Sequence, residues 1–552
     1  MLKYKLAQLL EEALAEAAAR KMLPQVAFPE VNLEHPQKPE HGDYASPIAL
    51  KLSRSVGLNP LKIAEILVSL LPPLEEVEEV WVAPPGFINF RLRKSWLIQQ
   101  TEEILKAGEA YGDLDLGQGR RVQVEFVSVN PTGPLHVGHG RGAVLGSTLS
   151  NILRACGFEV EREYYINDAG NQIEIFSRSL YSRYRQALGL PVELPPDAYQ
   201  GEYLLKLAQE IAHERGNSLL QLPEEEAIRQ IGHLGVQRFL QIIKQDLEML
   251  RVEFDNWFSE SSLYESGLFD KVMNLLQEKG FAEKRDGTLW FTSAELGEDK
   301  EAVLIRSSGM PTYFASDIAY HYDKFLVRGF DEVINIWGAD HQGHVSRMLA
   351  AVRALGVPPE RLKIIISQMV NLRRGEEEVK VSKRTGELIT LRELVEEVGA
   401  DACRFFFLSR SADSQMDFDL ELAKRQAPEN PVYYVQYAHA RISGILRLAR
   451  ERGIDYHGGD VSHLQEEAEL GLISKLVLLP EVLELAALNL EPHHLPHYAQ
   501  ELAVAFHNFY EKCRVVSSDG ALTQARLKLV EATRLVLTKL LKLMGITAPE
   551  RM

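Results

Sequence analysis

Residues 121–158 constrain the fold more than any other stretch of this chain. Apolar residues alternate from Val122 to Phe126, a loop rich in Pro and Gly follows, and apolar residues then recur three and four positions apart from Val144 to Leu153. Alternation is typical of a strand with one buried face, and the longer period is typical of an amphipathic helix. The stretch therefore predicts a strand, a tight loop and a helix in direct succession.

The loop in this stretch has the composition of a nucleotide site. Two histidines, His136 and His139, bracket Val137–Gly138, and further glycines stand on either side. Glycine lets a ligand approach the backbone closely, and the free N–H groups at the start of a helix favour phosphate oxygens. Two imidazoles at that place can donate hydrogen bonds as charge develops on a phosphate, without transferring a proton. The alternative interpretation is a glycine-rich turn whose histidines are ordinary surface residues.

A second ligand-binding edge is predicted at residues 331–344. The run VINIWG, ending at Gly338, is almost continuously apolar, as expected for a parallel strand covered on both faces. The polar string from Ala339 to His344 follows at the carboxyl end of that strand, where α/β proteins bind ligands. Asp340 is expected there either to accept hydrogen bonds from ribose hydroxyl groups or to cap a helix.

The chain divides into three expected units. Residues 1–110 predict an α/β module, and residues 111–390 predict an α/β domain built on a Rossmann-type, doubly wound parallel sheet. A helical insertion is expected within that second unit at about 175–250. Residues 391–552 keep apolar spacings of three and four and predict an all-α helix bundle.

Further strands are expected in the second half of the Rossmann-type unit. Strand-like runs occupy residues 252–264, 287–293, 300–321 and 331–344, and helices interrupt them. These runs predict that the sheet resumes after the helical insertion.

Charge and cysteine content limit the class of protein. A net charge of −17 argues against a nucleic-acid partner unless basic residues gather locally. Such clusters occur at Arg373–Arg374, around Lys380 and Lys383, and from Arg441 to Arg452, although each is also compatible with an ordinary solvated face. Only three cysteines are present, far apart and in no CxxC pair, which argues against a disulfide framework and against a zinc site.

The N-terminal residues point to the cytoplasm. They form an amphipathic pattern studded with Glu, instead of a charged segment followed by an apolar one, and no later run of about 18 uncharged apolar residues occurs. We therefore expect a cytoplasmic protein that makes no membrane contact.

Three motifs in a fixed order resemble one family. The string HVGH at residues 136–139 resembles the HIGH signature of class I aminoacyl-tRNA synthetases, and the longer string SVNPTGPLHVGHGR resembles its arginyl version. The string GADH at residues 338–341 resembles the ribose-binding motif of that class. The string KVSKR at residues 380–384 resembles its KMSKS loop. This order of motifs is far more specific than any one of them.

The flanking units resemble the same family. HGDYAS and PPGFINF in the first unit resemble the N-terminal domain of arginyl-tRNA synthetases, which contacts tRNA in that family. NPVYYVQYAHARI and the ending MGITAPERM resemble the anticodon-binding domain, where aromatic residues stack on unpaired bases. Without the resemblance, the aromatic and basic stripe in this bundle would be interpreted as core packing with a wet edge.

The resemblance implies a reaction and its participants. L-Arginine and ATP would give arginyl-adenylate and pyrophosphate, and the arginine would then pass to the terminal adenosine of tRNA(Arg). Mg²⁺ would accompany ATP as a phosphate-bound ion, because no dedicated metal cage is visible in the sequence. We expect a monomer.

The resemblance also implies roles for individual residues. The expected catalytic residues are His136, His139, Lys380 and Lys383. The expected ATP-binding residues are Pro131, Thr132, Gly133, Gly138, Gly140, Gly338, Asp340, His344, Val381 and Ser382. The expected arginine-binding residues are Glu125, Ser128, Asn130, His136, Glu260, Tyr313, Asp317 and His341. The expected tRNA-binding residues are Tyr433, Tyr437 and Arg441.

The chemistry of arginine supports an acidic pocket. A guanidinium is a planar fork of five donors that stays charged, so its site should contain carboxylates that accept hydrogen bonds in pairs. Two rival classes remain: an adenylyltransferase or ligase that shares the HxGH site, and a non-catalytic tRNA-binding paralogue. The first has no reason to carry the bundle or the N-terminal module, and the second is expected to lose the histidine pair or the lysine loop.

Overall fold

A parallel sheet lies at the centre of the molecule, and the computed structural model describes residues 1–292, 301–379 and 388–552. The strand order is β11-β10-β4-β5-β6, and every neighbouring pair is parallel. The strands are β4 (Arg121–Glu125), β5 (Glu159–Ile166), β6 (Asn256–Ser259), β10 (Glu332–Gly338) and β11 (Leu362–Ser367).

Two predictions are confirmed: the strand, loop and helix of residues 121–158, and the strand that ends at Gly338. Strand β4, a loop and helix α5 (Val137–Ala155) follow one another, and the apolar residues of α5 from Val144 to Leu153 are buried. Strand β10 lies between β11 and β4, and its residues from Val333 to Ile336 are all buried, so both faces of the VINIWG run are covered. Its carboxyl end leads into the short helix η6 (Ala339–His344), and α12 (Val345–Leu355) then connects β10 to β11.

The prediction that the later strand-like runs rejoin this sheet was right for two of the four runs. Residues 252–264 supply β6 and residues 331–344 supply β10, whereas the other two runs do not enter the parallel sheet. A separate antiparallel sheet contains the other strands, β7 (Ala282–Arg285), β8 (Thr288–Phe291) and β9 (Ala302–Ile305). Beyond β9 the run is helical because Thr312 caps helix α11 (Tyr313–Tyr322), its side chain accepting a hydrogen bond from the Ala315 N–H. A π-helical turn, η5 (Asp323–Val327), continues α11.

Short helices complete the surroundings of the sheet. They are α9 (Ser261–Glu265), α10 (Leu268–Glu278) and η7 (Pro359–Arg361). A further small sheet contains β12 (Val370–Arg374), β13 (Glu377–Glu378) and β14 (Met416–Asp419).

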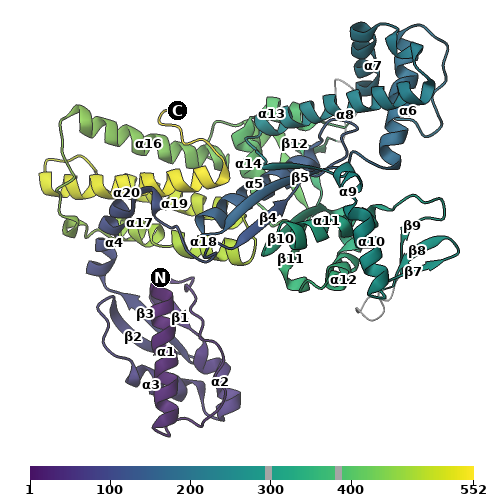
Figure 1. Ribbon diagram of the computed structural model, residues 1–552. Coiled ribbons are helices and arrows are strands. Elements are labelled where there is room, and N and C mark those ends of the chain that lie inside the picture. The colour runs from purple at the N-terminus through teal and green to yellow at the C-terminus, as the bar shows by residue number, and fades with distance from the viewer. Residues whose placement is uncertain (293–300, 380–387) are drawn as a thin grey trace.

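The segment between β5 and β6 is helical, as predicted. It contains α6 (Asn171–Ala187), α7 (Glu202–Arg215), η3 (Ser218–Gln221) and α8 (Glu224–Met249). These helices have an apolar core of their own and project from one end of the molecule (Figure 1).

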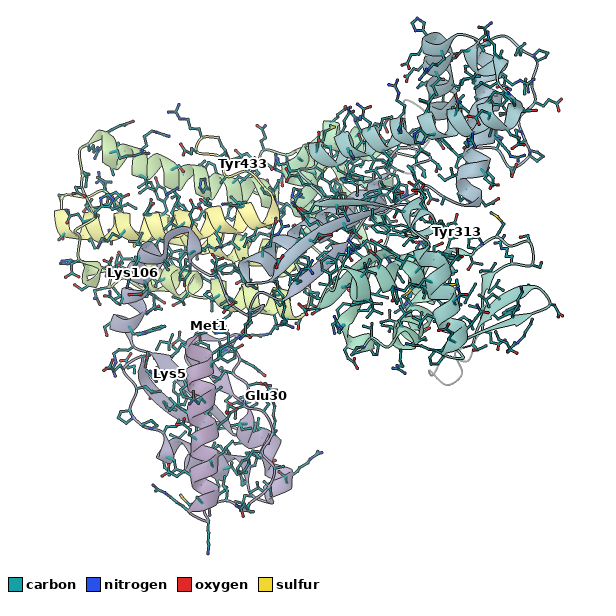
Figure 2. All side chains as sticks on the ribbon, viewed as in Figure 1. Met1, Lys5, Glu30, Lys106, Tyr313 and Tyr433 are labelled. Carbon is teal, nitrogen blue, oxygen red and sulfur yellow. The ribbon has the colours of Figure 1, made fainter. Side chains whose placement is uncertain are left out.

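The N-terminal residues form a module with a separate core that extends below the bundle (Figure 1). Its helices are α1 (Leu2–Ala19), η1 (Pro39–His41), α2 (Ile48–Val56) and α3 (Pro60–Leu70), and its strands are β1 (Tyr44–Ser46), β2 (Val77–Ala83) and β3 (Phe87–Leu92). Helices α4 (Lys94–Ala107) and η2 (Gly108–Ala110) lead to the central sheet. Lys5 of α1 forms an ion pair with Glu76 inside the module and is labelled in Figure 2.

The C-terminal part is the predicted helix bundle. Its elements are α13 (Leu391–Val398), α14 (Ala400–Leu408), α15 (Leu420–Lys424), α16 (Pro431–Glu451), η8 (Val461–His463), α17 (Glu467–Leu476), α18 (Leu479–Leu488), α19 (His494–Lys512) and α20 (Gly520–Met544). One apolar core runs through α5, the parallel sheet and these helices. No helix in the three described ranges has both the length and the apolar content of a membrane span.

Candidate active site

Two adjoining chambers open at the carboxyl ends of β4 and β10. The larger has a volume of about 580 Å³ and the smaller about 250 Å³. Ser128, Tyr313, Asp317 and His341 line both chambers. The size of the larger chamber lies in the range of small-molecule sites, and its place at strand ends is where such sheets bind ligands.

A strained turn at the end of β4 shapes the wall that the chambers share. Val127 and Ser128 have φ angles of +70° and +42°, which are rare for residues other than glycine and costly for a branched side chain. The Tyr165 N–H donates to Ser128 Oγ at 3.0 Å, and the Tyr164 hydroxyl donates to the Val129 carbonyl at 2.9 Å. Neighbouring strand β5 therefore holds the turn in place.

The two histidines predicted to be catalytic lie together at the start of α5. Their rings stack with centroids 3.5 Å apart, and the His136 N–H donates to His139 Nδ1 at 3.2 Å. Because Nδ1 accepts this hydrogen bond, the proton of a neutral His139 is on Nε2, where it can be donated to a ligand. Burial and the neighbouring His136 lower the pKa of His139 to about 3, so His139 is neutral at physiological pH. His139 lines the larger chamber, whereas His136 is exposed at its edge.

The glycines of this loop serve different purposes. Gly133 lines the larger chamber, next to Tyr203 of α7. A Cβ on Gly140 would stand 2.6 Å from Leu391 Cδ1, so this glycine allows α5 to pack against α13. A Cβ on Gly338 would stand 2.6 Å from an Asp340 carboxylate oxygen, so this glycine leaves room for that side chain. Only some of the glycines predicted to bind ATP therefore face the chamber.

Other residues predicted to bind ATP are divided between the chambers. Thr132 and Asp340 line the larger chamber, and Pro131 is buried beside Thr132. The Asp340 side chain is 81% exposed and lies 3.3 Å from His341 Nε2. His344 lines the smaller chamber, away from the other residues predicted to bind ATP. Gly138 packs against the His136 ring and lines neither chamber.

The predicted lysine loop lies outside the described residues. This applies to Lys380, Val381, Ser382 and Lys383. The first residues described after it meet the histidine loop, because Thr390 pairs with His136 and the Leu391 N–H donates to the Leu135 carbonyl at 2.8 Å. The fold thus brings Thr390 and Leu391, which closely follow the lysine motif in the sequence, into contact with Leu135 and His136 at the start of the histidine motif.

Asp317 is the acid that both chambers share. It lies one helical turn after Tyr313, which is 51% exposed and is labelled in Figure 2. Burial and the charges of Glu125 and Glu260 together raise the pKa of Asp317 to about 8, although the charge of Lys324 acts to lower it. An acid held in this way gains most from a ligand that brings a positive charge.

Glu125, at the end of β4, lines the smaller chamber and has a buried partner. Lys324 Nζ in η5 lies 2.5 Å from Glu125 Oε2, and the Lys324 side chain is fully buried. Lys324 also donates to Asn335 Oδ1 at 3.0 Å. No sequence pattern singles out Lys324, because a single lysine after a helix carries no motif.

Glu260 is buried beside the smaller chamber but lines neither chamber. Burial, with the nearby charge of Asp168, raises the pKa of Glu260 to about 7. Its Oε2 has no hydrogen-bond partner among the described residues, and neither does the hydroxyl of Tyr165, which does line the smaller chamber. Glu260 acts on Asp317 by its charge, and the side chains beside it are Ser316, Tyr264 and Tyr165, of which Tyr165 reaches the smaller chamber.

Residues from the helical insertion reach the larger chamber. Asn130 lines this chamber opposite Gln172 of α6 and Tyr203 of α7. Sequence reasoning missed Gln172 and Tyr203, because they lie in helices whose pattern indicates only packing.

A second candidate surface lies on the bundle. Tyr433 and Tyr437 stack with ring centroids 6.2 Å apart, and the Arg441 guanidinium lies 4.8 Å from the Tyr437 ring. The same guanidinium lies 4.7 Å from the ring of Tyr510 on α19, and the His507 ring stacks on Tyr437 at 5.9 Å. The three predicted residues thus share one face of α16, which begins beside the Tyr433 label in Figure 2.

One group of described side chains has the spacing of metal ligands, and it lies away from the chambers. Glu491, His493 and His494, in and after the α18–α19 loop, have ligand atoms within 4.8 Å of one another. The carboxylates on the larger chamber are Asp317 and Asp340. Two separated carboxylates suit a cation that is held mainly by phosphate oxygens better than a cation in a protein cage.

Family models match three consecutive parts of the chain. "Arginyl tRNA synthetase N terminal domain" matches residues 4–92, "tRNA synthetases class I (R), catalytic domain" matches residues 100–417, and "DALR anticodon binding domain" matches residues 435–552.

Curated relatives and a solved structure are similar along the whole length. The arginine–tRNA ligase of Dehalococcoides mccartyi is 55% identical, over 98% of this chain and 98% of its own. That of Carboxydothermus hydrogenoformans is 52% identical, over 94% of each chain. The structure of Thermus thermophilus arginyl-tRNA synthetase superposes with a TM-score of 0.79 at 25% identity and covers all of both chains.

Proposed function

Because this chain belongs to the arginyl-tRNA synthetase family and is an arginine–tRNA ligase of class I, we propose that its two chambers hold the two substrates of the activation step. In this proposal the smaller chamber binds the arginine side chain and the larger chamber binds ATP. The observation that carries it is the pair of acids, Glu125 and Asp317, beside a chamber that adjoins the neutral His139.

The acids suit a guanidinium better than any neutral side chain. One oxygen of Glu125 is bound to Lys324, and Asp317 has a raised pKa because it is buried and its neighbours are mostly negative. A guanidinium offers paired donors in a plane and a positive charge that stabilises both carboxylates. Ser128, Asn130, Tyr313 and His341 are proposed to hold the rest of the amino acid, since Ser128, Tyr313 and His341 line both chambers and Asn130 lines the larger one.

Activation then requires no covalent intermediate with the protein. The arginine carboxylate attacks the α-phosphorus of ATP, the bond to the β-phosphate oxygen breaks, and pyrophosphate leaves with the electron pair. The protein contributes by aligning the two groups and by stabilising the charge on the phosphate oxygens. Transfer follows when a ribose hydroxyl of the terminal adenosine attacks the arginyl carbonyl and AMP leaves.

His139 is proposed to donate its Nε2 proton to a phosphate oxygen. Its Nδ1 is occupied by the His136 N–H, so the donor on Nε2 is fixed before ATP arrives. His136 is proposed to act with it from the edge of the chamber, and Lys380 and Lys383 are proposed to complete the positive side of the phosphate site. Pro131, Thr132, Gly133, Gly338 and Asp340 would then contact the nucleotide, and Gly138 and Gly140 would support the loop.

The remaining expectations concern the partners. Tyr433, Tyr437 and Arg441 are proposed to contact tRNA, because stacked aromatic rings with a guanidinium form a platform for unpaired bases. Mg²⁺ is proposed to enter with ATP and to supply charge neutralisation at the phosphates. We further propose a monomer that acts in the cytoplasm, in keeping with three buried cysteines, none of them in a disulfide.

Separate binding titrations of the ligands test the assignment of the chambers. L-Arginine, its neutral analogue citrulline and ATP are titrated separately into the wild-type protein and into Glu125→Gln. The proposal expects Glu125→Gln to weaken arginine at least about tenfold and to leave ATP affinity within a factor of about two. Weaker ATP binding with unchanged arginine binding would place the nucleotide in the smaller chamber instead.

A further inference from the structure

Lys324 lies behind the smaller chamber, at the crossing of three elements. It belongs to the π-helical turn η5, and π-helical turns within helices are often found at functional sites. Its ammonium group reaches Glu125 Oε2 on β4 and Asn335 Oδ1 on β10, at 2.5 and 3.0 Å. Glu125 and Asn335 are register partners in the parallel sheet, so Lys324 bridges two side chains that stand side by side.

A hydrogen-bonded chain continues from Lys324 to the helix that carries Asp317. Asn335 Nδ2 lies 2.9 Å from His321 Nε2, and His321 Nδ1 lies 2.7 Å from the Asp317 carbonyl oxygen. The donor and the acceptor of each hydrogen bond follow from the groups at the two ends of this chain. An ammonium can only donate, so Asn335 Oδ1 accepts from Lys324 and its amide group donates to His321 Nε2. The proton of His321 is then on Nδ1, and it is donated to the Asp317 carbonyl.

The protonation state of His321 agrees with this direction. Burial and the charge of Lys324 lower its pKa to about 3, so His321 is neutral and its Nε2 can accept a hydrogen bond. The chain therefore links the two acids of the smaller chamber, Glu125 directly and Asp317 through its backbone, to one buried ammonium.

The charges around the chamber explain why an ammonium is needed there. The charged groups that interact with Lys324 are Glu125 of β4, Glu163 of β5, Asp317 of α11, Asp323 of η5 and Arg328 after η5. Those that act on Asp317 are Glu125, Glu260 and Lys324 itself. Without Lys324, Glu125 would lose its buried partner, and Asp317 would hold its proton more strongly, because a charge that lowers its pKa would be gone.

We propose that Lys324 is a positioning residue for the substrate arginine. Lys324 holds Glu125 toward the smaller chamber as a carboxylate. Through Asn335 and His321, it also ties the turn of α11 that carries Asp317 to the sheet. The inference rests on the proposed function in one respect, that the smaller chamber holds the guanidinium. The buried ammonium neutralises the charge of one acid, so the two acids of the chamber keep one negative charge for a ligand cation. It also binds one Glu125 oxygen, so the other Glu125 oxygen and the Asp317 carboxylate remain as acceptors for the planar guanidinium.

The test is a titration of L-arginine into Lys324→Met over a range of pH, without ATP or tRNA. Met keeps the length of the side chain and removes its charge. We expect arginine affinity at neutral pH to fall at least about tenfold and ATP affinity to stay within a factor of about two. We also expect the pH at which arginine affinity becomes constant to rise by about one unit, because the acids then hold protons more strongly.

Matched variants separate the two parts of the proposal. Asn335→Leu keeps the ammonium and breaks the chain to His321, so it should weaken arginine several-fold and keep the wild-type pH profile. Lys363→Met removes an exposed lysine from neighbouring strand β11 and should change neither quantity. If Lys324→Met does not fold, Lys324→Gln, which keeps a donor toward Glu125 without the charge, is titrated in its place.

The outcomes distinguish this inference from the proposed function. A Lys324→Met protein that binds arginine as the wild type does, or that binds it more weakly with an unmoved pH profile, overturns the charge-setting role. If Glu125→Gln and Asp317→Asn also leave arginine affinity unchanged, the smaller chamber does not bind the guanidinium, and the proposed function fails with it.

Discussion

Arginine affinity should depend on pH through Asp317. Its pKa is raised to about 8 in the free protein, and a bound guanidinium stabilises the ionised form. Below that pKa, arginine must displace a proton, so the affinity falls by about tenfold for each unit of pH. Relative to the plateau, about tenfold weaker binding is expected at pH 7 and about a hundredfold at pH 6.

Calorimetric titration of L-arginine from about pH 6 to about pH 8.5, in buffers of different ionisation enthalpy, measures both the affinity and the protons released. The histidines nearest the site do not interfere, because His139 and His321 have pKa values of about 3. Glu260, with a pKa of about 7, titrates in the same range, and Glu260→Gln isolates its share.

Asp317→Asn gives the decisive comparison. The variant should bind arginine at least about tenfold more weakly at pH 8, because a hydrogen bond to a charged group contributes roughly 1.5 to 3 kcal/mol. It should lose the pH dependence, leave ATP binding nearly unchanged, and discriminate less between arginine and citrulline.

The same variant should be more stable than the wild type at alkaline pH. A carboxyl group whose folded pKa exceeds its unfolded pKa makes the protein less stable as pH rises between the two values, and the loss is complete above the folded pKa. Asn carries no such charge, so its Tm should be higher by about 2 °C or more at pH 8.5. A pH-independent arginine affinity in the wild type, or a lower Tm for Asp317→Asn at that pH, would refute the assignment.

Four further results are expected. His139→Ala should lower the rate of adenylate formation, measured by single-turnover ATP consumption, by about 10²-fold with little change in tRNA affinity, and full activity would contradict the role of its Nε2 donor. Gly140→Ala should destabilise the protein by about 1–3 kcal/mol in thermal unfolding because of the contact with Leu391, whereas Gly142→Ala, with no atom within 4 Å of the added Cβ, should be neutral or stabilising. Tyr437→Ala should weaken tRNA binding by about tenfold in filter binding and spare arginine binding, and equal tRNA affinity would remove the platform from the interface. From the family resemblance, ATP–pyrophosphate exchange should require the cognate tRNA, and robust exchange without tRNA would exclude that coupling.

The sequence predicted those parts of the site that depend on local pattern. The strand, loop and helix around His136 follow from periodicity, and the place of Asp340 follows from the apolar run before it. The sequence signal at residues 313–322 was mixed: Tyr313 and Asp317 are spaced by one helical turn, whereas Phe314 and Ile318, which are buried in α11, also fit a strand-like run next to β9. The cap at Thr312 decides between the two, and a single threonine is a weak signal.

Lys324, Asn335 and His321 could not be predicted for a different reason. Their roles arise from contacts between β4, η5 and β10, which come together only through the register of the sheet. A buried lysine in a helical stretch has the same appearance in a sequence as an exposed one. The contacts of Arg441 with Tyr510 and of Tyr437 with His507 likewise depend on how α19 packs against α16.

The acids of the smaller chamber show how substrate selection can arise from an arrangement that is unfavourable in the free protein. Asp317, which lines this chamber, and Glu260 have raised pKa values because burial and nearby acids disfavour their charged forms, and Lys324 offsets only part of the effect on Asp317. A ligand that brings one delocalised positive charge stabilises the charged forms and supplies donors to the carboxylate oxygens. Citrulline has nearly the same shape, but it brings no charge and turns an acceptor toward a carboxylate, so it leaves the repulsion in place and adds an unpaired group. Selection against neutral analogues therefore follows from the electrostatic cost of the empty chamber, and any substitution that removes this cost should make the protein more stable and less selective.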